Sequence, residues 1–255
     1  MRNIHQRREQ IMQMLLEQGT VQVTALAPLL GVSVVTVRTD LTALESQGFA
    51  SRTFGGATLV RTPLQEQSVR QKSIVNSSLK ERIGLGAASL VNDGDNIIVD
   101  SGTTTLTLAQ HLRGMRVITV MTNGLNVAWS LADAEGVELM LVGGVLRKKS
   151  LSTLGAQAEA CLNSYTFDKL FLGVDGFDLQ FGLTTHHEAE ASLNFKMVQR
   201  AKKVIVLTDS SKFGRISLHR IVELDRVHAV VTDAGISPEY RDGLQRLGIE
   251  LIIAE

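Results

Sequence analysis

The pattern of apolar residues changes near residue 79, and this change constrains the fold more than any other feature of the sequence. Beyond that point, short apolar segments of strand length alternate with amphipathic segments of helical length. Such alternation predicts a mostly parallel sheet that helices cover on both faces. The predicted strands are 96–99, 117–121, 138–142, 170–174, 204–208, 227–232 and 249–253. The predicted helices include 79–90, 104–112, 125–132, 156–162 and 188–200.

The residues before position 50 are patterned differently, as three short helices. Apolar side chains at helical spacing predict a first helix over 3–18. Thr24 is placed to cap a second helix over 24–30, and Ser33 is placed to cap a third over 34–47. A glycine follows each of the three segments and favours the end of its helix. The second and third helices are therefore predicted to form a helix-turn-helix.

A β-hairpin is predicted directly after these helices. The segments 49–53 and 57–60 are short and extended, and Phe54-Gly55-Gly56 between them is typical of a turn. The hairpin makes the N-terminal module a winged helix-turn-helix, an α+β domain. The sequence then turns polar, with little apolar periodicity, as a linker with at most a short helix would. The predicted organisation is a DNA-binding domain at 1–61, a linker at 62–78 and a larger α/β domain at 79–255.

The start of the third helix carries the side chains that point to DNA. Short hydroxyls there can bond phosphates and base edges, a valine can contact a thymine methyl, and an arginine can reach guanine. Nearby arginines form a modest basic patch, although the 26 basic and 26 acidic residues of the chain cancel. A protein-contact module is the alternative, which the joint presence of wing and hydroxyl-rich helix start disfavours. The predicted DNA-binding residues are Arg7, Arg8, Ser33, Val35, Thr36, Arg38, Thr39 and Arg52, with Arg2 and Arg61 adding charge.

Polar and glycine-containing segments follow successive predicted strands of the larger domain. Asp100-Ser101-Gly102-Thr103-Thr104 leads from a strand into a helix, so backbone N–H groups and hydroxyls are aimed at an anion. Thr122-Asn123-Gly124 repeats the arrangement after the next strand, and Gly143-Gly144 allows close backbone approach after the third. Because the carboxyl ends of parallel strands meet at one edge of a sheet, these segments predict a crevice that binds phosphate.

Charged groups at later strand ends extend this predicted site. Asp175-Gly176 follows one strand, Glu188 and Glu190 begin a helix, and Lys212 follows another strand. Carboxylates accept hydrogen bonds from sugar hydroxyls, and a lysine supplies charge to phosphate. Each group alone is also explained as a cap or a turn residue, but together they favour a polyhydroxylated anion. The predicted effector-binding residues are Asp100, Ser101, Gly102, Thr103, Thr104, Thr122, Asn123, Gly124, Gly143, Gly144, Asp175, Gly176, Glu188 and Lys212.

Other chemistries find little support in the sequence. Adjacent His186 and His187 point apart on a helix or strand and make a poor chelating pair, so no metal or cofactor is expected. Cys161, the only cysteine, fits a reducing compartment, and its apolar neighbours predict a buried, inert thiol. Trp129 offers no stacking platform for single-stranded nucleic acid. No apolar run is long enough to cross a bilayer, and a cytoplasmic protein is expected.

Together these motifs resemble the DeoR family of bacterial transcriptional regulators over nearly the whole chain. In the N-terminal part the likeness lies in Arg7-Arg8, Val32-Ser33, Thr36-Val37-Arg38, Asp40-Leu41, Leu44-Glu45, Gly48 and Arg52-Thr53-Phe54-Gly55-Gly56-Ala57. In the larger part it lies in Asp100-Ser101-Gly102-Thr103-Thr104, Thr122-Asn123-Gly124, Gly143-Gly144, Phe167-Asp168-Lys169, Asp175-Gly176 and Asp209-Ser210-Ser211-Lys212. Within the family, Thr184-Thr185-His186 through Glu190-Ala191 resembles repressors of N-acetylgalactosamine or galactosamine catabolism.

The resemblance implies a sensor domain similar to ribose-5-phosphate isomerase behind the winged module. It further implies repression of a carbohydrate-catabolism operon, relieved by a phosphorylated sugar such as an amino-sugar or hexitol phosphate. A sugar-phosphate isomerase is the alternative, but residues 181–190 lack the glycine cluster such an enzyme needs beside its carboxylate. One small winged module offers few DNA contacts, so a homo-oligomer, a dimer or tetramer, is expected on a repeated operator. The family usually has arginine where Thr39 stands and histidine where Phe54 stands, so different operator contacts are expected.

Overall fold

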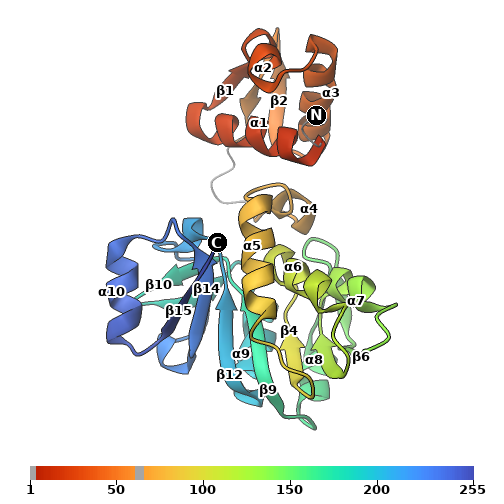
Figure 1. The fold of residues 1–255 in the computed structure, drawn as a ribbon, viewed down its shortest axis with the longest axis vertical. Helices are drawn as coiled ribbons and strands as arrows, with labels where there is room; N and C mark the ends of the chain where they lie inside the picture. The colour runs from red at the N-terminus through yellow and green to blue at the C-terminus, as the bar shows by residue number, and fades with distance from the viewer. Residues whose placement is uncertain (1–3, 61–65) are drawn as a thin grey trace. The chain divides into compact units, whose positions relative to one another are not determined.

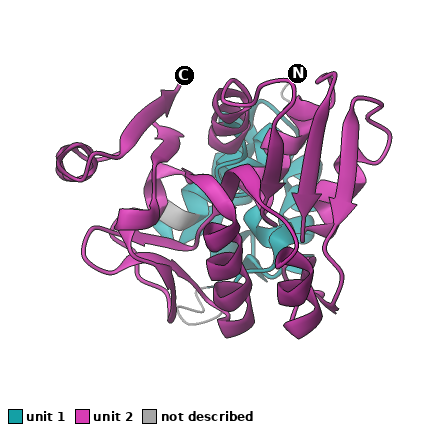
Figure 2. Cartoon of the chain, turned by 90° about the horizontal axis from the view of Figure 1, so that it is seen from below, with its two compact units in different colours: residues 1–78 teal, residues 79–255 magenta. Residues whose placement is uncertain are grey.

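The structure is a computed structural model that describes residues 4–60 and 66–255. The chain forms two compact units, Met1–Ser78, which we call unit 1, and Leu79–Glu255, which we call unit 2 (Figure 2). Each unit has its own hydrophobic core. The two are therefore described separately.

Unit 1 is a winged helix-turn-helix. Its elements are α1 (Ile4–Gln18), β1 (Thr20–Gln22), α2 (Val23–Leu30), α3 (Val34–Ser46), β2 (Ala50–Thr53), β3 (Gly56–Leu59) and α4 (Val69–Lys72). The three strands form an antiparallel sheet in the order β1-β3-β2. Ile11, Leu26, Leu41 and Leu44 fill the core between the helices and this sheet. The predicted hairpin is confirmed, and β1 adds a third strand to it.

The predicted helix caps of the helix-turn-helix are confirmed in part. Ser33 caps α3 as predicted, because its side chain accepts a hydrogen bond from the Thr36 backbone N–H at 3.1 Å. Gly31 adopts a left-handed φ of 67°, which ends α2. The predicted cap at Thr24 is wrong, since α2 begins one residue earlier with Gln22 as an N-cap that makes no side-chain bond. The turn between the helices is thus fixed by Gly31 and Ser33.

Part of the predicted linker is packed structure. Ser68 and Gln71 form a capping box at the start of α4. The Gln71 side chain also donates to the Gln47 carbonyl at 2.6 Å, which attaches α4 to the end of α3. The remaining linker residues 62–65 lie outside the described residues, as do Arg2 and Arg61.

The main sheet of unit 2 has seven strands in the order β15-β14-β12-β9-β4-β5-β6, and all neighbouring pairs are parallel. The predicted parallel sheet is confirmed. Its strands are β4 (Asn96–Val99), β5 (Ile118–Thr122), β6 (Val137–Leu141), β9 (Phe167–Gly173), β12 (Ala201–Leu207), β14 (Ala229–Asp233) and β15 (Glu250–Ala254). The helices are α5 (Ser77–Ala88), α6 (Thr103–Leu112), α7 (Leu125–Leu131), α8 (Ala156–Leu162), α9 (Glu188–Arg200) and α10 (Pro238–Arg246).

Helices cover both faces of this sheet (Figure 1). Leu170 and Leu172 of β9 point to the core formed with α8, α9 and α10, whereas Phe171 between them points to the core formed with α5, α6 and α7. Successive side chains of a strand point to opposite faces, so one strand supplies both cores. Each strand except β15 continues at the carboxyl edge into a loop or a helix.

Several short elements escaped sequence analysis. They are the hairpin β7 (Val145–Arg147) and β8 (Ser152–Leu154), and a small antiparallel sheet of β10 (Gly176–Asp178), β11 (Gly182–Thr185) and β13 (His219–Val222). Two 3₁₀ turns, η1 (Ser210–Lys212) and η2 (Leu224–Arg226), complete the described elements. Strands of three or four residues are too short to show a period.

Three further expectations concern Cys161, metal binding and membrane-spanning helices. Cys161 is half-buried against the core on α8, so the predicted full burial is wrong. No group of three or more His, Cys, Asp or Glu side chains in the described ranges is placed to hold a metal ion. Among those same residues no single helix could span a membrane, and only α2 and α3 together, bent by 111°, meet the length and composition required.

Candidate functional site

The exposed face of α3 is the first candidate site. Val35 is 70% exposed, and Arg38 and Thr39 are exposed beside it. The Arg38 side chain makes no hydrogen bond or ion pair with any residue that the structure describes. Thr39 donates its hydroxyl to the Val35 carbonyl at 3.1 Å, so the oxygen keeps its acceptor capacity. The helix therefore presents a methyl surface, an unpaired guanidinium and hydroxyl acceptors to an external partner.

Arg7 and Arg8 do not lie on this face as free charges. The Nε atom of Arg7 is 2.5 Å from one carboxylate oxygen of Asp40, and that of Arg8 is 2.9 Å from the other. Asp40 is 1% exposed and the Arg7 side chain 11%. The hydrogen bond to Asp40 raises the pKa of Arg7. Through these Nε atoms Arg7 and Arg8 hold α1 against α3, and their contact with DNA stays a prediction.

Arg52 links the wing to the recognition helix. Its guanidinium donates to the Arg38 carbonyl at 3.2 Å and to the Thr42 hydroxyl at 2.9 Å. Its backbone N–H donates to the Glu45 carboxylate at 2.7 Å. Arg52 was predicted as a DNA contact, and the structure gives it a positioning role as well. The wing and α3 are thereby held in a fixed relation.

The second candidate site lies at the carboxyl edge of the parallel sheet. The loop after β4 crosses the loop after β5, where the Ser101 N–H donates to Asn123 Oδ1 at 2.9 Å. Asn126 of α7 reaches back to the Gly102 carbonyl at 3.2 Å. Gly102 has a φ of 149° that favours glycine, and it caps α6 without a side-chain bond. The first N–H groups of α6, at Thr103 and Thr104, are left for an external acceptor.

Unsatisfied polar atoms are buried at the same place. Asn123 is 1% exposed and Thr105 is fully buried, yet Asn123 Nδ2 and Thr105 Oγ1 have no hydrogen-bond partner among the described residues. The Asn123 amide orientation follows from the bond that its Oδ1 accepts. Leaving a buried donor unpaired costs roughly 1–3 kcal/mol. A ligand with acceptor oxygens would remove that cost.

A carboxylate network lies beside this loop. Glu190 of α9 is 9% exposed, and its Oε1 is 3.3 Å from Arg147 Nη1 of β7. Ser152 of β8 and Thr185 of β11 also donate to Glu190, each at 3.4 Å. Thr185 in addition contacts Asp175 at 3.2 Å. Two pairs of neighbouring segments, β7 with β8 and β11 with α9, thus meet around one carboxylate.

The two glutamates near the start of α9 lie in different surroundings. Glu188, which is predicted to bind the effector, is exposed at the start of the helix. Glu190 lies two residues later, is buried, and belongs to the network above. Along a helix, two residues turn the side chain to a different face. Glu190 therefore joins the candidate site, and the role of Glu188 stays a prediction.

Asp100 connects the loop to the network electrostatically. It is 3% exposed, and burial together with the negative charge of Glu190 raises the pKa of Asp100 to about 8. The N–H of Gly173 and the hydroxyl of Ser101 donate to its oxygens at 3.3 and 3.5 Å. At neutral pH the side chain holds a proton and can donate a hydrogen bond. A ligand at this edge would meet the protonated Asp100 beside the carboxyl group of Glu190.

Lys212 belongs to a separate polar cluster at the end of β12. Burial opposes ionisation of Asp209, but the hydrogen bond from Ser211 and the charges of Lys212 and Lys80 outweigh it and lower the pKa of Asp209. Asp233 at the end of β14 accepts the Ser210 N–H at 2.7 Å. Lys212 and Lys80 thus both lie near the Asp209 carboxylate.

Several predicted site residues have packing roles. Thr122 accepts the Gly124 N–H at 3.0 Å and so shapes its own loop. A Cβ on Gly144 would lie 2.5 Å from the Leu154 carbonyl oxygen, and one on Gly176 would lie 2.3 Å from the Arg215 carbonyl oxygen. Gly143 has no such neighbour within 4 Å. Close backbone packing therefore requires glycine at positions 144 and 176, and their part in ligand binding stays a prediction.

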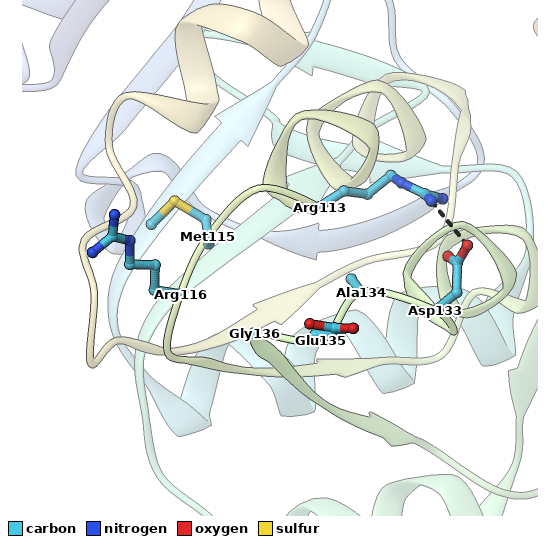
Figure 3. Close-up of a pocket in the computed structure, with 7 residues that line it drawn as sticks. All are labelled: Arg113, Met115, Arg116, Asp133, Ala134, Glu135 and Gly136. Carbon is cyan, nitrogen blue, oxygen red and sulfur yellow. Dashed lines mark hydrogen bonds and ion pairs between the residues drawn. The ribbon is translucent and has the colours of Figure 1, made fainter.

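A pocket of about 600 Å³ lies elsewhere in unit 2 (Figure 3). Its lining residues, Arg113, Met115, Arg116 and Asp133 to Gly136, precede β5 and β6. They lie at the amino ends of these strands, opposite the carboxyl edge. Arg113 and Asp133 form an exposed ion pair at 3.0 Å, with 48% and 72% of their side chains exposed. This pocket contains none of the predicted site residues, and buried unpaired atoms favour the carboxyl edge instead.

These two sites define a class of protein: a DNA-binding regulator in which a winged helix-turn-helix precedes an α/β sensor domain. Residues 7–62 match the DeoR-like helix-turn-helix domain, and residues 75–234 match the DeoR C terminal sensor domain. The chain belongs to the DeoR family of transcriptional regulators.

Relatives of known description cover the whole chain. A protein of Escherichia coli O157:H7 described as an aga operon transcriptional repressor is 48% identical over 250 residues, 97% of this chain and 93% of that one. The HTH-type transcriptional repressor GlcR of Bacillus subtilis (strain 168) is 38% identical over 247 residues, 96% and 94% of the two chains. The resemblance to repressors of galactosamine-type catabolism is thereby confirmed.

Solved structures match only part of the fold. Ribose 5-phosphate isomerase A from Methanocaldococcus jannaschii is similar over 54% of this chain and 55% of its own, with 18% identity and a TM-score of 0.41. No functional conclusion is drawn from that likeness.

Sequence reasoning missed Arg147, Ser152 and Lys80 as site residues. Arg147 and Ser152 lie in the three-residue strands β7 and β8, and Lys80 is buried in α5. Only the Arg147-Lys148-Lys149 run offered a signal, and such runs are usually solvated.

Proposed function

We propose that this protein represses a carbohydrate-catabolism operon and releases its operator when a phosphorylated sugar binds unit 2. The observation that carries the proposal is the pair of buried unsatisfied groups, Asn123 Nδ2 and Thr105 Oγ1, at the uncapped start of α6. The repressing direction is supported by the descriptions of the two bacterial relatives. Its place of action would be the cytoplasm, where operator DNA lies.

The proposed effector pose follows from charge. Phosphate oxygens would accept from Ser101, Asn123 and the N–H groups of Thr103 and Thr104, since a helix start favours an anion. Glu190 and Asp175 would accept sugar hydroxyls or an amino group, and protonated Asp100 would donate. Lys212 would add charge from the neighbouring cluster. An amino-sugar or hexitol phosphate suits this set, and the aga operon relative favours the amino sugar.

On the DNA side, Ser33, Val35, Thr36, Arg38 and Thr39 of α3 would enter the major groove. Arg38 is the residue proposed to read a base, because its guanidinium is exposed and unpaired among the described residues. Arg52 would assist by fixing the wing.

A homo-oligomer is part of the proposal, because two winged modules bind a repeated operator with a gain in effective concentration. Unit 2 offers a surface for it. Trp129 and Leu125 lie one helical turn apart on α7, with exposures of 82% and 40%. Leu141 at the sheet edge and Val145 are exposed as well. Light scattering of Trp129→Lys beside Val117→Lys, an exposed apolar control, tests this surface.

Catalysis is not proposed, because the relatives are described as repressors. One experiment tests the whole proposal: a thermal-shift screen of phosphorylated pentoses, hexoses and hexosamines, followed by operator gel shifts with each hit. A phosphorylated sugar should stabilise the protein while its unphosphorylated parent does not, since selective native-state binding raises stability. Equal stabilisation by both compounds, or turnover of the sugar phosphate, contradicts the proposal.

A further inference from the structure

The tip of the wing carries an aromatic side chain that is fully exposed among the described residues. Phe54 is 108% exposed, whereas Phe49, the other aromatic residue of unit 1, is 3% exposed in the core. Isolated apolar residues on a surface are ordinary. Phe54 differs because the backbone around it is held in place on three sides.

Strand pairing and hydrogen bonds hold the turn around Phe54 in place. Thr53 pairs with Gly56, so Phe54 and Gly55 form a tight turn, and Gly55 has a left-handed φ of 86°. The Gly55 carbonyl accepts the Val23 N–H at 2.8 Å, which attaches the tip to the start of α2. Arg52, two residues before Phe54, holds α3 through the Arg38 carbonyl and Thr42 hydroxyl. The aromatic ring is thus carried by a support fixed to both helices of the helix-turn-helix.

Resting on the DNA-binding function proposed above, we propose that Phe54 is an apolar DNA contact that enters the minor groove beside the major groove read by α3 and wedges against a base step. The occupant is duplex DNA because the wing is continuous with the recognition helix of a family-defined DNA-binding module. Apolar side chains on minor-groove binders partly unstack base steps and bend the duplex. A phenylalanine supplies such a wedge without adding charge.

The absence of charge gives the proposal a distinctive signature. Arginine and lysine contacts to phosphate release counterions, so their loss lowers the slope of log affinity against log salt. Loss of Phe54 removes an apolar contact and leaves that slope unchanged. Affinity and salt dependence together therefore separate a wedge from a further backbone contact.

The test uses the full chain and duplexes that it selects from a random pool, with 2-aminopurine placed at successive steps flanking the selected motif. Phe54→Ala should weaken binding about tenfold, as expected for losing a buried aromatic contact. The salt slope should stay constant, and the 2-aminopurine fluorescence rise seen at one step with the unaltered chain should disappear. Phe54→Leu should keep most of the affinity. Val60→Ala, at the other end of the hairpin and 43% exposed, is the matched control and should bind normally.

The outcomes are separable. If the unaltered chain selects no motif, the DNA-binding proposal itself fails. If it selects one and Phe54→Ala binds with the same affinity and the same fluorescence response, only the wedge is refuted. A Phe54→Ala variant that binds DNA normally but loses self-association would assign the ring to a protein contact and equally overturn the wedge. Because Phe54 is fully exposed in a turn, all variants should show the unaltered melting temperature.

Discussion

The two sites of this molecule are built in opposite ways. On α3 the arginine proposed to read a base, Arg38, is exposed and unpaired among the described residues, while the charges that hold the helix in place, Arg7 and Asp40, are buried and paired. At the carboxyl edge of the sheet the groups proposed to meet the effector, Asn123 and Asp100, are themselves buried. Function and stability therefore depend on different residues in unit 1, and on the same residues in unit 2.

The largest expected effect tests the support of α3. Asp40→Ala leaves the guanidinium of Arg7 buried without its carboxylate, and removing one partner of a buried pair costs about 3–5 kcal/mol. Urea unfolding should show an early transition for unit 1, and DNA binding should be lost with it. Effector binding by unit 2 should persist.

A matched control for this variant is Asp133→Ala, which breaks the exposed pair with Arg113 and should cost about 0–1 kcal/mol. If the two variants lost the same free energy of unfolding, burial would not distinguish the two ion pairs. The proposed difference between buried supporting charges and exposed DNA-binding groups in unit 1 would then be refuted.

The second prediction concerns the surface itself. Arg38→Ala should weaken specific operator binding by about 1–3 kcal/mol if the guanidinium reads a base, and it should leave urea unfolding and effector binding unchanged. Gel shifts with selected and scrambled duplexes measure the change. Arg70→Ala, on exposed α4, serves as the charge-matched control. If Arg38→Ala still distinguished the selected duplex from the scrambled one normally, Arg38 would not read a base.

Sequence analysis predicted the scaffold better than either site, and particular residues show why. The bounds of β4, α8 and α9 were predicted to the residue, because each has a continuous pattern within its own segment. Asp40 carries no local sign that it accepts from Arg7 and Arg8, more than thirty positions earlier. Glu190 likewise acquires Arg147 as a partner only when β7 and α9 fold together. Long-range pairing of charges is a property of tertiary structure, so one sequence does not display it.

The third prediction uses the raised pKa of Asp100, about 8 in the folded protein against about 4 in an unfolded chain. Between these values the folded state binds the extra proton, so the stability of unit 2 should fall as pH rises, by at most ~1.4 kcal/mol per pH unit. The lowered pKa of Asp209 acts in a more acidic window and does not oppose this trend. Urea midpoints from pH 5 to about 8 measure it. Asp100→Asn, which stays neutral, should flatten the dependence, and an unchanged slope in that variant would assign it to other groups.

The smallest expected effect is at Lys212, and it tests whether the two polar clusters of unit 2 act on one ligand. Lys212→Ala should weaken effector binding by about 1 kcal/mol, because a lysine contributes a single point charge to phosphate while N–H groups and hydroxyls supply the remaining bonds. Basal operator binding should be unaffected, so the variant needs more sugar phosphate for the same release in a gel shift. Lys202→Ala is the control. It removes an exposed lysine at the start of β12, which pairs with Asp168 of β9, and the variant should respond normally to the effector. Because Lys212 also lowers the pKa of Asp209, its loss should reduce the stability of unit 2 near neutral pH with or without effector, and the difference should vanish as acid protonates Asp209. An unchanged effector midpoint together with that loss of stability would show that Lys212 serves only Asp209, and the ligand site would then be confined to the edge between β4 and α9.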